Sequence, residues 1–306
     1  MTVFHLLVYL SLLVFLAAVI ARVVRIARMP IHLRWELYPV PHEKGRASYG
    51  GSTLEEVDWW TKPRQVDRIG ELAAMIPEML FLKGLWEHNR PMWFGSFALH
   101  FGLYLLIGEL ALLVLSGLLS IAGATGGILD ILLSLILILA WVGCILGIIG
   151  TIIMFYKRLA DRKLRLHTNA SHFFNLLLLG AIYLTGLLWV ASDSSYAANV
   201  SAFFVGWMSL SAMPALPAIG YWHIGCVLLF FVYFPFTHMT HAFIKWFTYH
   251  DVRWEDQPNL PEGKMQAEIE KLESQIVTWA APHVNADGRK TWVDIVSETG
   301  EEKKEK

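Results

Sequence analysis

The sequence predicts an all-α integral membrane protein built as a bundle of five transmembrane helices. Its 306 residues are 55% hydrophobic and only 17% charged, so the chain is more apolar and less charged than an ordinary soluble domain of this length. Stretches of helical length and high hydropathy recur along the chain. The five predicted spans are residues 3–21, 92–119, 129–155, 173–191 and 222–243.

The loops between these spans differ sharply in charge. Residues 22–91 and 156–172 are rich in Lys and Arg, whereas residues 120–128 and 192–221 contain neither. Because basic loops stay on the cytoplasmic side, we expect an outer N-terminus, two inner loops and a cytoplasmic C-terminal tail. The protein would then lie in the lipid bilayer of the inner (cytoplasmic) membrane as a multi-pass protein. The net charge of −1 gives no field that would favour nucleic acid.

Four regions follow from this pattern. Residues 1–21 form the first transmembrane helix, which we interpret as a retained span because no basic segment precedes it and no small-residue cleavage site follows it. Residues 22–91 form a cytoplasmic loop with an interfacial helix over its apolar stretch, 69–86. Residues 92–243 form a four-helix membrane domain. Residues 244–306 form a cytoplasmic tail for partner docking, with an amphipathic helix over 261–281 and a disordered end.

Cysteine usage limits the redox chemistry that this chain can support alone. Cys144 and Cys226 both lie in apolar stretches, and no CxxC or CxxCH motif is present. A zinc site, an iron–sulfur cluster, a disulfide framework and covalent haem c are therefore not expected. Any redox centre would need another type of ligand.

The last predicted span contains three histidines, His223, His238 and His241. His223 and His241 are eighteen residues apart, which is five helical turns, so a continuous helix would place both on one face about 27 Å apart. Ionisable side chains inside a bilayer are costly and are functional candidates by default. Pro235 removes a backbone hydrogen bond and is expected to kink this helix, turning His238 and His241. The alternative is that these histidines sit at the interface, bonded to carbonyls or headgroups.

The second span offers a partner for the inner end of the last span. His100 lies about 12 Å inside the inner end of its helix, at a depth comparable to that of His241. Two imidazoles from facing helices at one depth are what a six-coordinate haem b requires. We therefore predict His100 and His241 as axial ligands of the haem iron. His172 and His238 lie at the same inner level and are alternative ligands or partners of a haem propionate.

Two glycines near His100 also favour a haem at this position. Gly95 and Gly102 are expected to let a porphyrin edge approach the helix backbone.

The segment FGSFALH, the eighteen-residue histidine interval and FPFTHMTH in the last span resemble the gamma subunit of respiratory nitrate reductase, a five-span membrane cytochrome b with two haems. The resemblance implies an inner haem on His100 and His241. It also implies an outer haem on His223 and on a histidine ten residues after His100. This sequence departs from that pattern, because Leu110 stands there and is preceded by Glu109.

That departure leaves three alternatives for His223. His5 lies near the outer end of the first span and could supply the missing ligand. The outer haem could instead be absent, with His223 serving a quinone site or a surface hydrogen bond. Glu109 could lie close to His223 and accept a proton from quinol, or it could pair with a cation of a partner subunit.

The inner-loop segment PIHLRWELYPVPHE, residues 30–43, resembles the cytochrome b subunits of the Dsr, Tmc and Hmc redox complexes of sulfate-reducing anaerobes. This resemblance implies a cytoplasmic iron–sulfur subunit of the heterodisulfide reductase type as partner. A second membrane subunit and a periplasmic multihaem cytochrome c are further partners that it implies.

The expected function is electron transfer in anaerobic respiration. A membrane subunit with one or two haems b would connect the menaquinone pool with the iron–sulfur subunit, and substrate chemistry would belong to other subunits. The chain itself would be non-catalytic or reactive only toward quinone. The competing interpretation is a haem-free membrane anchor or a small transporter, although transporters usually show repeated halves and none is visible in this sequence.

Overall fold

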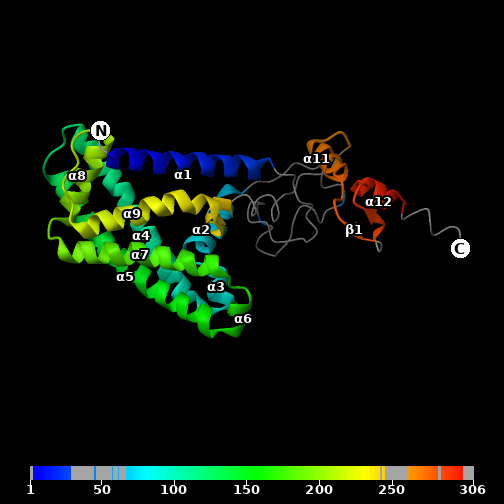
Figure 1. Cartoon of the computed structure of the whole chain (residues 1–306), viewed down its shortest axis with the longest axis horizontal. Helices are drawn as coiled ribbons and strands as arrows, with labels where there is room; N and C mark the ends of the chain where they lie inside the picture. Colours follow the sequence, from blue (N-terminus) through cyan, green and yellow to red (C-terminus); the bar gives the residue numbers. More distant parts are fainter. Residues whose placement is uncertain are drawn as a thin grey trace. The chain divides into compact units, whose positions relative to one another are not determined.

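A computed structural model describes residues 3–28, 45, 57, 61, 67–241, 243–244, 261–281 and 284–298 (Figure 1). The chain divides into two compact units. One comprises Met1–Arg22 with Met75–Thr240, and the other comprises Val23–Ala74 with His241–Lys306. Residues 30–43 and 299–306 lie outside the described residues, so the resemblance carried by the first and the disorder expected of the second stay predictions.

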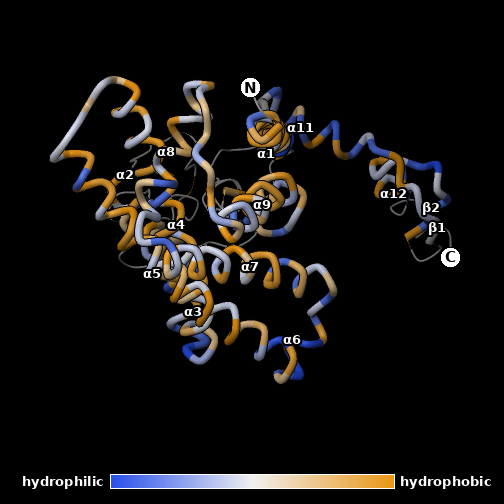
Figure 2. Tube along the Cα trace, turned by 60° about the vertical axis from the view of Figure 1, so that its left-hand side comes forward, coloured by the Kyte–Doolittle hydropathy of each residue, from blue (hydrophilic) through white to orange (hydrophobic). Residues whose placement is uncertain are grey.

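The five predicted spans are confirmed as helices long and apolar enough to cross a membrane. The first four are α1 (Val3–Ala27), α4 (Arg90–Ile121), α5 (Gly127–Ala160) and α7 (Ala170–Ser192). The fifth runs over Ala218–Phe236 and consists of α9 (Ala218–Tyr233) and the 3₁₀ turn η4 (Phe234–Phe236). Figure 2 shows that apolar residues dominate these helices. The protein is thus an all-α membrane protein.

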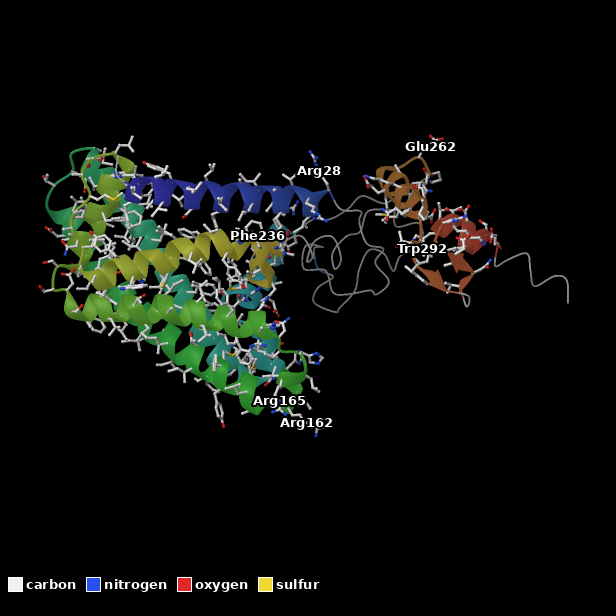
Figure 3. The ribbon with its side chains drawn as sticks, in the orientation of Figure 1. Arg28, Arg162, Arg165, Phe236, Glu262 and Trp292 are labelled. Carbon is white, nitrogen blue, oxygen red and sulfur yellow. The ribbon has the colours of Figure 1, made fainter. Side chains whose placement is uncertain are left out.

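Shorter helices occupy the connections. The predicted interfacial helix is two helices, α2 (Arg68–Leu80) and α3 (Lys83–His88), separated by Leu82 in the left-handed region. The basic loop contains α6 (Arg162–Leu166), and Figure 3 shows Arg162 and Arg165 projecting from it. The segment between α7 and α9 begins with α8 (Tyr196–Met208), which packs on α4 and α5.

Helices α4 and α5 approach each other backbone to backbone. A Cβ atom on Gly102 would lie 2.6 Å from the Gly147 nitrogen and 2.7 Å from the Gly143 oxygen. No side chain fits at this crossing, so glycine on both helices is what lets them touch. Tyr183 of α7 then packs over Gly147 and donates a hydrogen bond to the Leu99 carbonyl oxygen of α4, at 3.0 Å.

This contact overturns the role expected for the glycines near His100. A Cβ atom on Gly95 would lie 2.5 Å from Ile153 Cγ2 of α5, and Gly102 faces the α5 backbone. The prediction that Gly95 and Gly102 admit a porphyrin edge is therefore wrong. Both positions are used for helix packing.

The last span is broken rather than merely kinked. Helix α9 ends at Tyr233, and Thr237 is extended (φ −110°, ψ 171°) between η4 and the 3₁₀ turn η5 (His238–Thr240). Arg22 of α1 donates from Nη1 to the carbonyl oxygens of Pro235 and Thr237, at 2.7 and 3.3 Å. The prediction of one continuous helix that carries His223 and His241 on one face is wrong, because Pro235 and Thr237 interrupt it.

The C-terminal residues form a small α/β element. It contains α11 (Lys264–Glu273), an antiparallel pair of strands β1 (Ala280–Ala281) and β2 (Ala286–Asp287), and α12 (Trp292–Glu298). The amphipathic helix predicted over 261–281 is confirmed only as far as Glu273. Ile276, which falls within the predicted range, instead lies in an isolated β-bridge with Thr291.

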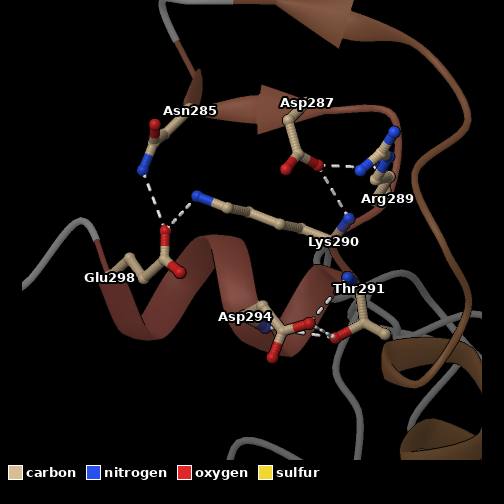
Figure 4. Close-up of polar contacts among 7 residues, drawn as sticks. All are labelled: Asn285, Asp287, Arg289, Lys290, Thr291, Asp294 and Glu298. Atoms are coloured by element: carbon tan, nitrogen blue, oxygen red, sulfur yellow. Dashed lines mark hydrogen bonds and ion pairs between the residues drawn. The ribbon is translucent and has the colours of Figure 1, made fainter.

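Two aspartates organise the turn and the helix start of this element (Figure 4). Asp287 accepts hydrogen bonds from the backbone N–H groups of Arg289 and Lys290, at 2.8 and 2.9 Å. Asp294 accepts from the Thr291 N–H at 2.9 Å and from its hydroxyl at 2.7 Å. These backbone hydrogen bonds lower the pKa of both carboxyl groups.

A lowered carboxyl pKa makes the element sensitive to acid. The two ionised carboxyl groups contribute fully to the stability of the element above the pKa of an unfolded aspartate, about 4. This contribution is lost as the pH falls through the lower pKa values that the groups have in the folded protein. We expect amide protection over residues 277–298, corrected for intrinsic exchange, to be constant from pH 7 to 5 and to fall near pH 3. Asp287→Asn should reduce both the protection at pH 7 and the size of this acid-induced fall. Equal protection at pH 7 and pH 3 would contradict this assignment.

Two matched substitutions on α4 test the glycine contact. Gly102→Ala should lower the unfolding temperature in detergent, because overpacking against backbone costs about 1–3 kcal/mol. Gly108→Ala should be neutral or slightly stabilising, since a Cβ atom there meets only Leu139 Cδ1 at 3.5 Å. Equal unfolding temperatures for the two variants would rule out a tight crossing at Gly102.

Candidate functional site

A cavity of about 310 Å³ lies among α1, α4, α5, α7, α8 and α9. Its wall is mostly apolar and aromatic, which is typical of small-molecule sites. The polar or ionisable side chains in the wall are few: Glu109, Cys144, Tyr183, Trp189, Tyr196, Trp207 and His223. The structure therefore brings Glu109 and His223, two candidates from the sequence, to one cavity.

Glu109 is buried and paired. Its Oε1 accepts a hydrogen bond from the Tyr196 hydroxyl at 2.7 Å. Tyr196 lies in the first turn of α8, and its ring packs edge-on against Trp189 of α7. Trp189 Nε1 in turn donates to Asp193 Oδ2 at 3.1 Å. The carboxylate is thus held inside the protein by a neutral donor on a neighbouring helix.

His223 is oriented by α7. Its Nδ1 lies 3.1 Å from the Ile182 carbonyl oxygen and 3.1 Å from Thr185 Oγ1. Because a carbonyl oxygen only accepts, Nδ1 carries the proton and Nε2 carries the lone pair. A Cβ atom on Gly186 would lie 3.0 Å from His223 Cε1. Glycine at this position therefore gives the imidazole its room.

His5 is placed elsewhere. It is buried in α1, and its Nε2 lies 3.1 Å from the Ser211 carbonyl oxygen and 3.3 Å from that of Gly206. These contacts tie α1 to the end of α8 and the segment after it. Val8 and Leu12 of α1 line the cavity, but His5 is not among the lining residues. The pairing of His5 with His223 stays a prediction, and these contacts do not favour it.

His100 has the geometry that metal-ligating imidazoles commonly show. Its Nδ1 lies 2.7 Å from the carbonyl oxygen of Ser96, one turn earlier on α4. This bond fixes the proton on Nδ1 and leaves the lone pair on Nε2, which is how a backbone carbonyl orients an axial histidine. His241 follows directly after η5 and belongs to the second unit, so its pairing with His100 stays a prediction.

The two alternative ligands from the sequence, His172 and His238, lie together. The rings of His172 and His238 have centroids 4.7 Å apart. Asn175, buried on α7, places its Nδ2 3.4 Å from His238 Nε2 and accepts a hydrogen bond from the Tyr233 hydroxyl at 2.8 Å. His172 accepts at Nδ1 from the Asn169 N–H at 3.2 Å and so caps α7.

Three of these partners were missed from the sequence. Asn175 could have been predicted as a functional or structural polar group, since it is an amide within an apolar stretch. Tyr196 and Tyr233 gave none, because tyrosine is common near the ends of membrane helices and its hydroxyl partner is set by tertiary packing.

A model of the nitrate reductase gamma subunit family matches residues 84–255, more than half of the chain. The chain belongs to the nitrate reductase gamma subunit family. Members of this family are membrane subunits of redox complexes that in general bind haem b and transfer electrons. No curated protein and no solved structure matches the chain.

The region that matches the family model contains the candidate residues of the later spans but not the one in the first span. His100, Glu109, His223, His238 and His241 all lie within it, whereas His5 lies outside. The imidazole of His100 has the protonation pattern that haem ligation needs, so this residue fits the group that the family binds.

The buried amide of Asn175 gives a test of the histidine cluster. Asn175→Leu should destabilise the protein by about 1–3 kcal/mol, because it leaves the Tyr233 hydroxyl without its acceptor. The double variant Asn175→Leu/Tyr233→Phe should cost less than the sum of the two single variants, since both partners are then removed. Thermal unfolding in detergent measures all three, and strictly additive effects would contradict the coupling.

Proposed function

We propose that this protein is the haem b subunit that transfers electrons between the menaquinone pool and a cytoplasmic iron–sulfur subunit of the heterodisulfide reductase type. The observation that carries the proposal is the Nδ1 bond from His100 to the Ser96 carbonyl, which prepares Nε2 for iron inside a bundle of the haem-binding family. A bound haem b would supply reversible one-electron chemistry.

The proposed axial ligands are His100 and His241. Ser96 would hold the His100 ring in its orientation, and the Arg22 bonds to Pro235 and Thr237 would fix the break that precedes His241. The contacts of His172 with Asn169, and of His238 with Asn175, support hydrogen-bonding roles for these two histidines rather than ligation.

The cytoplasmic tail, residues 244–306, is the proposed docking region for the iron–sulfur subunit. Trp279 and Trp292 are 48% and 44% exposed, and their rings lie 6.2 Å apart. Paired exposed tryptophans are characteristic of protein interfaces. A second membrane subunit and a periplasmic multihaem cytochrome c complete the complex that the resemblance implies.

The proposal predicts a cofactor that depends on one particular histidine. The protein purified with its partners should show the absorption bands of reduced haem b, resolved from any haem c. His100→Ala should abolish these bands, because the iron loses an axial ligand. His88→Ala, which removes an exposed histidine at the end of α3, should leave them unchanged.

His241→Ala extends the test to the second proposed ligand and should also abolish the bands. If the native protein shows no haem b bands, the chain is a haem-free anchor or transporter. If His241→Ala retains full absorption while His238→Ala or His172→Ala does not, the second ligand is the other histidine.

A further inference from the structure

The turn between α5 and α7 gathers positive charge. Residues 156–172 contain five Lys or Arg residues and one carboxylate, Asp161. Asp161 Oδ1 accepts hydrogen bonds from the backbone N–H groups of Lys163 and Leu164, at 2.8 and 3.4 Å, and so caps the start of α6. Among the described residues, none of the five cations forms an ion pair. The turn therefore carries charge that the described part of the chain does not neutralise.

Arg158, in the last turn of α5, is held in a fixed orientation by this turn. Its Nη1 donates to Thr168 Oγ1 at 3.1 Å, and Thr168 Oγ1 in turn donates to the Leu164 carbonyl oxygen at 2.7 Å. Arg158 Nε is buried and has no acceptor among the described residues. A buried charged donor without an acceptor is unfavourable, and the guanidinium fork matches the oxygen atoms of a phosphate. The arrangement thus favours a ligand with anionic oxygen atoms.

The surroundings of Arg158 belong to the edge of a membrane. Both α5 and α7 are long and apolar enough to span it, so the turn that joins them lies at the level of the lipid head groups. Tyr156, Leu159 and Leu166 in this turn are 68%, 52% and 77% exposed. Exposed apolar side chains among cations are typical of segments that rest on a lipid surface. A dissolved phosphate ion would leave these three side chains in water, whereas a phospholipid would cover them.

We propose that the turn between α5 and α7 binds the phosphate group of an anionic phospholipid. Arg158 is the main donor, and Arg162 and Arg165, which project from α6 in Figure 3, supply further positive charge beside it. The acyl chains lie against Leu159 and Leu166. None of these residues lines the cavity that contains Glu109, and the site does not depend on the proposed electron transfer.

A pair of charge-removing variants separates a built site from the general attraction of a basic turn. The full chain is placed in phosphatidylcholine vesicles, and its preference for spin-labelled phosphatidylglycerol over spin-labelled phosphatidylcholine is measured by electron paramagnetic resonance. In about 0.5 M KCl, exposed charges are screened beyond a few ångströms. We expect Arg158→Gln to lower the preference about fivefold. The matched control Lys163→Gln, which removes an exposed cation of the same turn, should keep the native preference.

Thr168 gives a second test that leaves the charge unchanged. Thr168→Val removes the hydroxyl that orients Arg158, so it should also lower the lipid preference. Thr168→Ser retains the hydroxyl and should restore the native value. A loss that serine does not restore would contradict the orienting role of this hydroxyl group.

Three other results would overturn the lipid site. The first is a native chain without preference for phosphatidylglycerol, or an equal loss in Arg158→Gln and Lys163→Gln. The second is displacement of the spin-labelled lipid by inorganic phosphate at unchanged ionic strength, which would assign the site to a free anion. The third is a loss of haem b from Arg158→Gln, which would assign the guanidinium to the cofactor. We expect no displacement and a native haem content.

Discussion

The close crossing of α4 and α5 is the contact on which the rest of the membrane unit depends. Gly102 meets Gly143 and Gly147 with no room for a side chain, so the two longest helices are fixed by backbone contact. Tyr183 then ties α7 to the Leu99 carbonyl of α4. Since α4 carries both His100 and Glu109, this contact fixes the helix that bears these two side chains.

A second constraint acts at the end of the last span. Pro235 and Thr237 end the regular helix, and Arg22 of α1 donates to the carbonyl oxygens that are exposed there. A charged donor compensates backbone groups that a bilayer would leave unsatisfied. The break separates His223, on the regular part of α9, from the histidines beyond it, so these residues can serve different partners.

The sequence was sufficient for the spans, because hydropathy acts locally. The cost of buried ionisable groups also selected His100, Glu109 and His223 as candidates, and two of these, Glu109 and His223, line one cavity. It was not sufficient for the break after Tyr233, which Arg22 stabilises from more than 200 residues away. Nor did it reveal that Tyr196 holds Glu109, or that Gly102 faces α5, since tertiary packing decides both. The end of α11 at Glu273 was missed because Ile276 fits either a helix face or a strand.

The most direct test of the account is the haem content of the detergent-purified chain, measured as pyridine haemochrome against quantitative amino-acid analysis. The account predicts one haem b per chain, unchanged in His223→Ala. No haem b would contradict the electron-transfer function, and two haems b per chain, falling to one in His223→Ala, would contradict a single haem held by His100 and His241.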